Sequence, residues 1–293
     1  MKHRTNNAHG RLTQEVAHEL KDHKQSFLVF SILRFLVIVV LVRQIMLQSY
    51  QSAFLCILTL LLLYVPSWIQ IKLRIELPQP MEITVLCFIF AAEILGEVNA
   101  FYVVIPGWDT VLHTINGFLA AAVGFSLVLL LNKNKHAAFA LSPCFLALVA
   151  FCFSMTVGVV WEFLEFGADW FLHTDAQKDT VIHAIHSVAL DPTRSNQIIS
   201  IENIVDTAVN GQSLELDGYL DIGLIDTMKD LLVNFLGAAV FSLIGFFFIS
   251  GNHALKTIVA SFVPRVKLGL GPERDSAAVP EAREDGPTEN RKN

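Results

Sequence analysis

The sequence predicts an all-α membrane protein: a polytopic bundle of about six transmembrane helices, with a small extracytoplasmic β-rich insertion between the fifth and sixth. Three observations lead to this fold class. The 293-residue chain is 53% hydrophobic and only 16% charged, it contains several long apolar runs, and one polar segment changes to a strand-like pattern. An apolar helix of about 20 residues spans the roughly 30 Å hydrocarbon core of a bilayer. Such a composition is typical of membrane proteins.

Six segments have the length and hydropathy expected of transmembrane helices. They are 27–47, 51–71, 80–104, 109–131, 139–168 and 226–249. No small-residue cleavage pattern follows the first segment, so we expect it to remain in the mature chain. The expected organisation is a cytoplasmic N-terminal segment, two N-terminal spans, a four-span core, and a cytoplasmic, largely disordered tail. These regions are 1–26, 27–79, 80–249 and 250–293.

The two ends of the chain differ in character. Leu12, Val16 and Leu20 recur at helical spacing, which predicts a short amphipathic helix over 1–25. Residues 271–293 are rich in Glu, Arg, Pro, Gly and Asn, and they have too few large apolar residues to offset the entropy of ordering. We therefore expect the C-terminal tail to be disordered.

Basic residues flank alternate ends of the spans. They precede the first span and follow the second, fourth and sixth: Lys2, Arg4, Arg11, Lys21, Lys24, Lys72, Arg74, Lys133, Lys135, Lys256, Arg265 and Lys267. Because cytoplasmic loops carry an excess of Lys and Arg, these four segments and both termini are expected in the cytoplasm. The segment 169–225 instead contains mostly acidic residues, so we place it outside.

This outer segment has the features of a small β-element over 175–222. Val181–Val188 and Gln197–Ile201 are short and rich in β-branched residues, Asp191-Pro192 favours a turn, and Asn210-Gly211 is a strong hairpin dipeptide. Such an element could simply pack over the mouth of the bundle or act as a lid over it.

Four of the expected spans carry pairs of ionisable residues at their outer ends. The pairs are Glu93/Glu97, Asp109/His113, Glu162/Glu165 and Asp226/Asp230. A spacing of three or four residues places both members of a pair on one helix face. Ionisable groups at membrane depth are costly and usually face a bundle interior or a water-filled cavity. The sequence therefore predicts one polar pocket, open to the extracytoplasmic side.

The fourth and sixth spans also resemble one another, which indicates a parallel internal repeat. Each opens on Asp-Thr, at Asp109 and Asp226, and each continues to an Asn, Asn116 or Asn234, among small residues. Taken alone, the two Asp residues have the positions of helix N-caps. Their partners His113 and Asp230 lie one turn deeper, so capping does not account for them.

So many carboxylates in one pocket require neutralisation. Protons, a divalent cation or Arg43 are the candidates. Carboxylates with a histidine suit Mg, Mn or Zn, and the candidate metal ligands are Glu93, Asp109, His113, Glu162, Glu165, Asp226 and Asp230. Arg43, Asn116 and Asn234 are candidate substrate-binding residues. If the pocket carries out a reaction, His113 or Glu162 is its acid or base.

Other chemistries find no support. The net charge of −6 and the lack of a basic, aromatic-rich patch argue against a nucleic-acid partner. The four cysteines lie in apolar spans without metal-ligand spacing.

The motifs Trp108-Asp109-Thr110-Val111-Leu112-His113, Trp161-Glu162-Phe163-Leu164-Glu165 and Gly223–Leu231, followed by Gly237-Ala238, resemble the YjdF-like family of uncharacterised bacterial inner-membrane proteins. The chain is more distantly similar to VanZ-like proteins, whose motifs occur in the same order. The resemblance covers roughly residues 80–249. It implies a bacterial plasma-membrane protein, and the association of the VanZ-like group with glycopeptide resistance implies envelope lipids or cell-wall precursors as ligands.

Three functions remain open at this point. The first is an envelope protein that binds, and acts on, an amphiphilic lipid or cell-wall precursor, with a cation in the acidic pocket and Arg43 on an anionic head group. The second is a proton- or cation-coupled transporter that uses the same carboxylates. The third is a structural or partner-binding membrane protein without catalysis.

Overall fold

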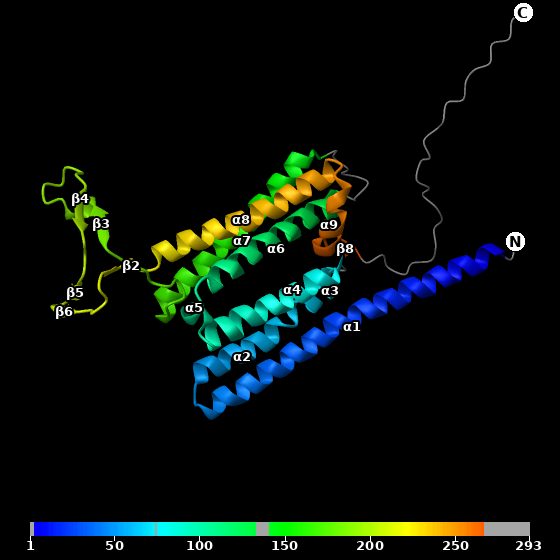
Figure 1. Ribbon diagram of the computed structural model, residues 1–293, viewed down its shortest axis with the longest axis horizontal. Helices are drawn as coiled ribbons and strands as arrows, with labels where there is room; N and C mark the ends of the chain where they lie inside the picture. The colour runs from blue at the N-terminus through cyan, green and yellow to red at the C-terminus, as the bar shows by residue number, and fades with distance from the viewer. Residues whose placement is uncertain (1–2, 74, 133–140, 267–293) are drawn as a thin grey trace, which may run out of the picture.

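The chain folds into a bundle of long helices with a small strand-rich insertion projecting from one end (Figure 1). The structure, a computed structural model, describes residues 3–73, 75–132 and 141–266. The expected disordered tail, 271–293, lies outside the described residues.

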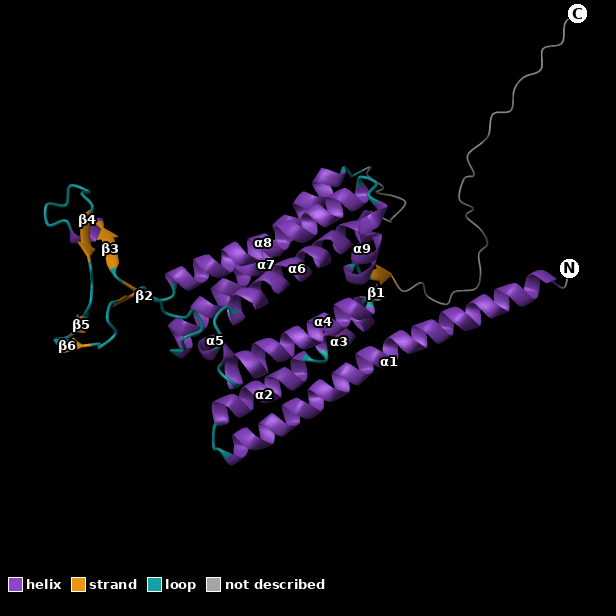
Figure 2. Cartoon of the chain, viewed as in Figure 1, coloured by secondary structure: helices purple, strands orange, loops and turns teal. Residues whose placement is uncertain are grey.

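Helices make up most of the described chain. They are α1 (His3–Met46), α2 (Tyr50–Leu62), α3 (Val65–Leu73), α4 (Gln79–Phe90), the π-helix η1 (Ala91–Val98), α5 (Phe101–Val104), α6 (Trp108–Asn132), α7 (Pro143–Leu172), the short η2 (Val188–Leu190), α8 (Leu224–Ile249), η3 (His253–Leu255) and α9 (Lys256–Phe262). Figure 2 shows the strands in two places, in the insertion and at the far end of the bundle.

Within the described residues, five helical segments are long and apolar enough to cross a membrane. They are Lys24–Met46, Tyr50–Lys72, Trp108–Leu129, Pro143–Leu172 and Leu224–Ile249. Many large apolar side chains on these helices are exposed, as with Phe35 at 65% and Phe54 at 64%, which fits a surface covered by lipid. The length and composition of these helices therefore identify the chain as an integral membrane protein.

Two sequence-based expectations differ from this arrangement. The expected span 80–104 is divided into α4, η1 and α5, because the helix widens to a π-helix at Ala91 and ends at Val98. The amphipathic helix expected over 1–25 is helical from His3 but runs on into the first span as the single helix α1. Neither Gly nor Pro stands at that junction to end a helix.

The helices pack as two groups. One buried cluster joins α1, α2, α4 and η1 around Val37, Cys56 and Ile94. The other joins α6, α7, α8 and α9 around Phe125 and Phe241. The α4 and η1 segment thus packs with the two N-terminal helices, and the space between the two groups becomes available for a cavity.

Small residues bring α6 and α8 unusually close. A Cβ atom added to Gly117 would collide with the backbone of Asn234, and one added to Gly237 would collide with the backbone of Thr114 and Phe118. Close backbone approach through small residues is the usual way that membrane helices associate. The two helices begin at the same end of the bundle (Figure 1), so their first turns also lie close together.

The insertion between α7 and α8 contains three short antiparallel strand pairs, so the strands that the sequence predicts in this segment are present. They are β2 (Val181–Ile182) with β7 (Tyr219–Leu220), β3 (Ala184–Ser187) with β4 (Ile199–Glu202), and β5 (Ala208–Val209) with β6 (Gln212–Ser213). Asn210 and Gly211 both have positive φ, which is the geometry of the hairpin turn that this dipeptide favours.

A fourth strand pair, β1 (Ile75–Glu76) with β8 (Arg265–Val266), lies at the opposite end of the bundle (Figure 2). It joins the α3–α4 connection to the segment after α9. The first described residues after α8, including η3 and α9, are therefore ordered against the bundle.

The tight α6–α8 contact leads to a first prediction. Gly237→Ala forces a methyl group against the backbone of α6, so the free energy of unfolding should fall by about 1–3 kcal/mol, the usual effect of overpacking. Gly167→Ala is the matched control, because a Cβ atom at this helical glycine meets nothing within 4 Å. Thermal unfolding in detergent should show a lower Tm for the first variant alone, and equal Tm values would contradict the close contact.

Candidate metal centre

His113 stands at the centre of a cluster of carboxylates from three helices. Its Nε2 atom lies 3.4 Å from Asp109 Oδ1 and 3.7 Å from Asp230 Oδ2, and its Nδ1 atom lies 4.0 Å from Glu162 Oε1. The His113, Glu162 and Asp230 side chains are buried, and Asp109 is partly exposed. One imidazole therefore has an acidic neighbour on each side.

The helices place these groups in simple ways. Asp109 and His113 are one turn apart on α6, so they share a face. Asp230 reaches the same point because α8 runs close beside α6, and Glu162 comes from the third helix, α7. One possible ligand atom from each of Asp109, His113 and Asp230 lies within 4.8 Å of the others. This triad has the residue types and compactness of a metal centre.

Glu162 is the most informative member of the cluster. It is only 4% exposed, and neither of its carboxylate oxygens has a well-formed hydrogen bond among the described residues, although the Thr227 and Gln177 side chains lie close to it. Buried polar atoms are nearly always hydrogen-bonded, and an exception calls for an explanation such as a bound ion or water. This buried carboxylate faces the Nδ1 atom of His113, so it is available to accept a hydrogen bond from the imidazole.

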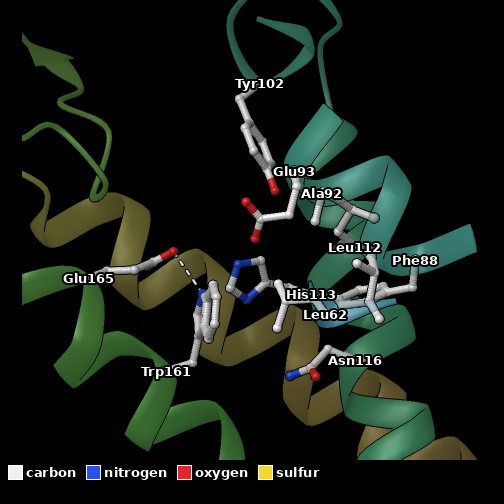
Figure 3. Close-up of a pocket in the computed structure, with 11 residues that line it drawn as sticks. Leu62, Phe88, Ala92, Glu93, Tyr102, Leu112, His113, Asn116, Trp161 and Glu165 are labelled. Atoms are coloured by element: carbon white, nitrogen blue, oxygen red, sulfur yellow. Dashed lines mark hydrogen bonds between the residues drawn. The ribbon is translucent and has the colours of Figure 1, made fainter. Parts of the chain in front are cut away.

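The π-helix positions a further carboxylate. Glu93 lies in the first turn of η1, and in Figure 3 its carboxylate points toward the His113 ring while the Tyr102 hydroxyl points toward Glu93. Tyr102 can approach η1 because residue 96 is glycine. A Cβ atom at this position would overlap the Tyr102 ring. Single π-helical turns often occur at functional sites, and here the turn brings Glu93 to the edge of the cluster.

Two adjoining cavities lie beside this cluster, and Glu93, Tyr102, Trp161 and Glu165 line both. The outer chamber, of about 150 Å³, is lined by Lys178 and by acidic residues of the site. These are Glu93, Glu97, Asp109, Glu165, Asp226 and Asp230. The inner chamber, of about 200 Å³, has mostly apolar walls and contains His113 and Asn116. The Trp161 indole donates a hydrogen bond to Glu165 (2.7 Å; Figure 3).

The structure places the remaining candidates as follows. Asn116 lines the inner chamber and donates a hydrogen bond to Asn234 (3.3 Å). Asn234 is fully buried and donates in turn to the Ser154 carbonyl on α7 (3.4 Å), so it ties three helices together. Arg43 is exposed on α1 and is not among the residues that line either chamber.

The capping interpretation of Asp109 and Asp226 is wrong. Asp109 is already the second residue of α6, and α8 is capped by Gly223 in the left-handed conformation. Asp226 instead accepts a hydrogen bond from the Lys178 backbone amide (2.8 Å). The N-cap Gly223 lies three residues before Asp226 and the helix begins at Leu224, so the Asp226 carboxylate is free to hold the chain that leaves α7.

Sequence reasoning missed two residues of this region. Lys178 lines the outer chamber, although in the sequence it is one isolated basic residue in a long acidic segment. Tyr102 lines both chambers, and its only sequence signal was an aromatic residue near a span end, where aromatic belts are common.

The bundle of apolar helices around a buried ionisable cluster defines the class: an integral membrane protein with a polar site within its helices. A family model described as "Predicted membrane protein (DUF2238)" matches residues 28–251. The chain therefore belongs to this family of predicted membrane proteins. No curated protein and no solved structure matches the chain.

The unpartnered state of Glu162 leads to a second prediction. Glu162→Met keeps most of the side-chain volume and removes a buried polar group without a partner, so the metal-free protein should gain about 1–3 kcal/mol of stability. Glu202→Met, at an exposed strand position, is the control and should change little. Chelator-treated proteins are compared by thermal unfolding, and a lower Tm for Glu162→Met would mean that the carboxylate is already satisfied.

Proposed function

We propose that this protein binds a divalent cation through Asp109, His113 Nε2 and Asp230, with Glu162 on the Nδ1 side of the same imidazole as its hydrogen-bond acceptor, and uses the occupied site to bind and act on an amphiphilic envelope lipid or cell-wall precursor. The observation that carries the proposal is the buried, unpartnered Glu162 carboxylate next to the compact triad. A cation on His113 Nε2 would fix the imidazole proton on Nδ1, which faces Glu162 and would become its hydrogen-bond donor, and the cation would compensate the clustered negative charge.

The distances are compatible with this role. Ligand oxygens and nitrogens lie about 2.0–2.2 Å from Zn²⁺ or Mg²⁺, so two ligand atoms of one ion are at most about 4.4 Å apart. The spread of up to 4.8 Å within the triad then needs only small side-chain rotations. Carboxylate and imidazole ligands together suit Zn²⁺ or Mn²⁺, and Mg²⁺ when water completes the shell.

The other acidic residues form a second ring in this proposal. Glu93, Glu165 and Asp226 line the outer chamber, where they would hold water bound to the ion and orient the primary ligands. Lys178 lines the same chamber, and its ammonium group is paired with Asp175 (3.8 Å). On leaving this exposed pair it would take the role that the sequence suggested for Arg43, the contact with an anionic head group. If the site carries out a reaction, Glu162 would act as the acid or base, or His113 would do so after it dissociates from the ion.

A coupled transporter receives less support from the structure. The polar series from Asp109 and His113 continues inward to Asn116, Asn234 and Ser154. Immediately beyond it, the described part of the bundle is closed by Ala121, Phe125 and Phe241, all with no exposed surface. The buried Ser126 and Ser242 hydroxyls lie in this otherwise apolar region, whereas a transport path would need a continuous polar route or open space on that side.

We also propose that α4 and η1 form the sixth span, and that the insertion and the site face the outside of a bacterial plasma membrane, with both termini in the cytoplasm. The two segments are consecutive and contain 12 and 8 residues, enough together to cross the hydrocarbon core. The helices α3 and α9, which contain Lys72 and Lys256, lie at the end of the bundle away from the insertion (Figure 1), as the distribution of basic residues favours.

Cysteine labelling tests this topology. In a variant without the native cysteines, Gln212→Cys in the insertion should react with a membrane-impermeant maleimide in intact cells. Asn252→Cys, an exposed position after α8, should react only after the membrane is permeabilised. Labelling of Asn252→Cys from outside would place the site on the cytoplasmic side.

Metal dependence tests the site. A cation that binds only the folded protein stabilises it by about 2.7 kcal/mol at a hundredfold excess over Kd, so chelator should lower the Tm of the wild-type protein. Asp230→Asn removes one ligand charge and should abolish both the bound metal and the response to chelator. The matched control is Asp217→Asn, at an exposed position in the insertion.

Metal content is measured on protein purified in detergent, and thermal unfolding is recorded with chelator and with added Zn²⁺, Mn²⁺ or Mg²⁺. A Tm that none of these additions changes, in protein that is shown to be folded, would contradict cation binding. It would leave a structural network of protonated carboxylates.

A further inference from the structure

The inner chamber differs from the candidate metal centre in chemistry and in location. Its apolar wall comes from α2, α4 and α6, through Leu62, Phe88, Ile89 and Leu112. The acidic residues stand at its opposite end, where it adjoins the outer chamber at Glu93 and Glu165. The combined cavity is thus polar at one end and apolar at the other.

The polarity follows the helix axes. Glu93 is near the outer end of the α4 and η1 segment, and Phe88 lies more than one turn before it. On α6, Asp109 is at the outer end and Leu112 follows one turn deeper. Moving from the end of the bundle that carries the insertion toward its middle, the lining therefore changes from mostly carboxylates to mostly apolar side chains, with His113 and Asn116 as the polar groups on the α6 side.

The size of the inner chamber limits what it can hold. An engineered apolar cavity of about 150 Å³ binds a benzene ring, and the inner chamber has about 200 Å³. That space accepts part of one hydrocarbon chain and is too small for two chains side by side. An apolar chamber of this size without an apolar occupant would forfeit packing contacts along its walls.

Trp161 stands between the chambers and the surface of the bundle. This residue lines both chambers and is 46% exposed, and its indole is hydrogen-bonded to Glu165. A chain that enters from the bilayer on this side would pass the indole, with its head group at the outer chamber.

We propose that the inner chamber is the binding site for a single hydrocarbon chain and that the ligand is a one-chain anionic amphiphile whose head group reaches the outer chamber. This inference rests on the proposed function and specifies its ligand class. The head group would lie between the cation ligands and Lys178, and the chain would extend along Leu112 toward Leu62 and Phe88.

A photoreactive probe tests the chain site directly. The wild-type protein in phosphatidylcholine nanodiscs is mixed with dodecyl phosphate that carries a diazirine on its last carbon, irradiated, digested and analysed by mass spectrometry. The expected result is labelling of the peptides that contain Leu62 and Phe88. Unlabelled dodecyl phosphate should compete, and phosphatidic acid, which carries two chains, should not.

Two variants on adjacent positions of α2 provide the control. Leu62→Trp fills the end of the chamber and should reduce labelling roughly tenfold, equivalent to about 1.4 kcal/mol of binding. Leu61→Trp adds the same ring at a side chain that is 63% exposed and should leave labelling unchanged. Equal labelling of the two variants, labelling confined to lipid-facing residues, or competition by phosphatidic acid would overturn the single-chain site.

Metal content, measured on the same samples, separates this inference from the cation proposal. Leu62→Trp should keep its bound metal, because Leu62 lies on α2, outside the helices that carry the proposed ligands, and its side chain is not a ligand. Bound metal without labelling of the chamber would contradict the chain site alone. Labelling that is competed by the one-chain probe in protein without any metal would support the chain site and contradict the cation proposal.

Discussion

The close contact between α6 and α8 is the constraint on which the rest of the site depends. Gly117 and Gly237 leave no room for a side chain between the two backbones, so the first turns of both helices lie within reach of each other. Asp109, His113 and Asp230 consequently meet although they are far apart in the sequence. Because Asn116 and Asn234 hydrogen-bond one turn deeper, the same contact is fixed by polar as well as steric means.

The arrangement of the two helix groups explains why the site has a cavity beside it. Each group has its own buried cluster, so neither needs the other to complete its core, and the junction between them is left incompletely filled. The widening of the helix at η1 directs Glu93 into this junction. A cation centre supported by α6, α7 and α8 would then be rigid on one side and open on the other, as a binding site requires.

Much of this could be predicted from single helices, and the rest depended on contacts between them. The apolar runs and the spacing of Asp109 with His113 are local properties, so the sequence correctly predicted the helical membrane fold and the strand content of the insertion. The π-helix, the glycine cap of α8 and the role of Asp226 in holding Lys178 arise from tertiary contacts. The exposed position of Arg43 could not be predicted either, because the packing of α1 against α2 and α4 determines it.

The proposed cation lies at His113, held by α6 and α8, with Glu162 of α7 on the far side of the imidazole. The most direct measurement is anomalous X-ray diffraction from crystals of the wild-type protein grown with Mn²⁺ or Zn²⁺, recorded at the absorption edge of the metal. We expect one strong peak about 2.0–2.2 Å from His113 Nε2 and from the Asp109 and Asp230 carboxylates, with Glu162 turned toward Nδ1. An ordered His113 cluster with no peak, or peaks only at the acidic residues of the insertion, would contradict it.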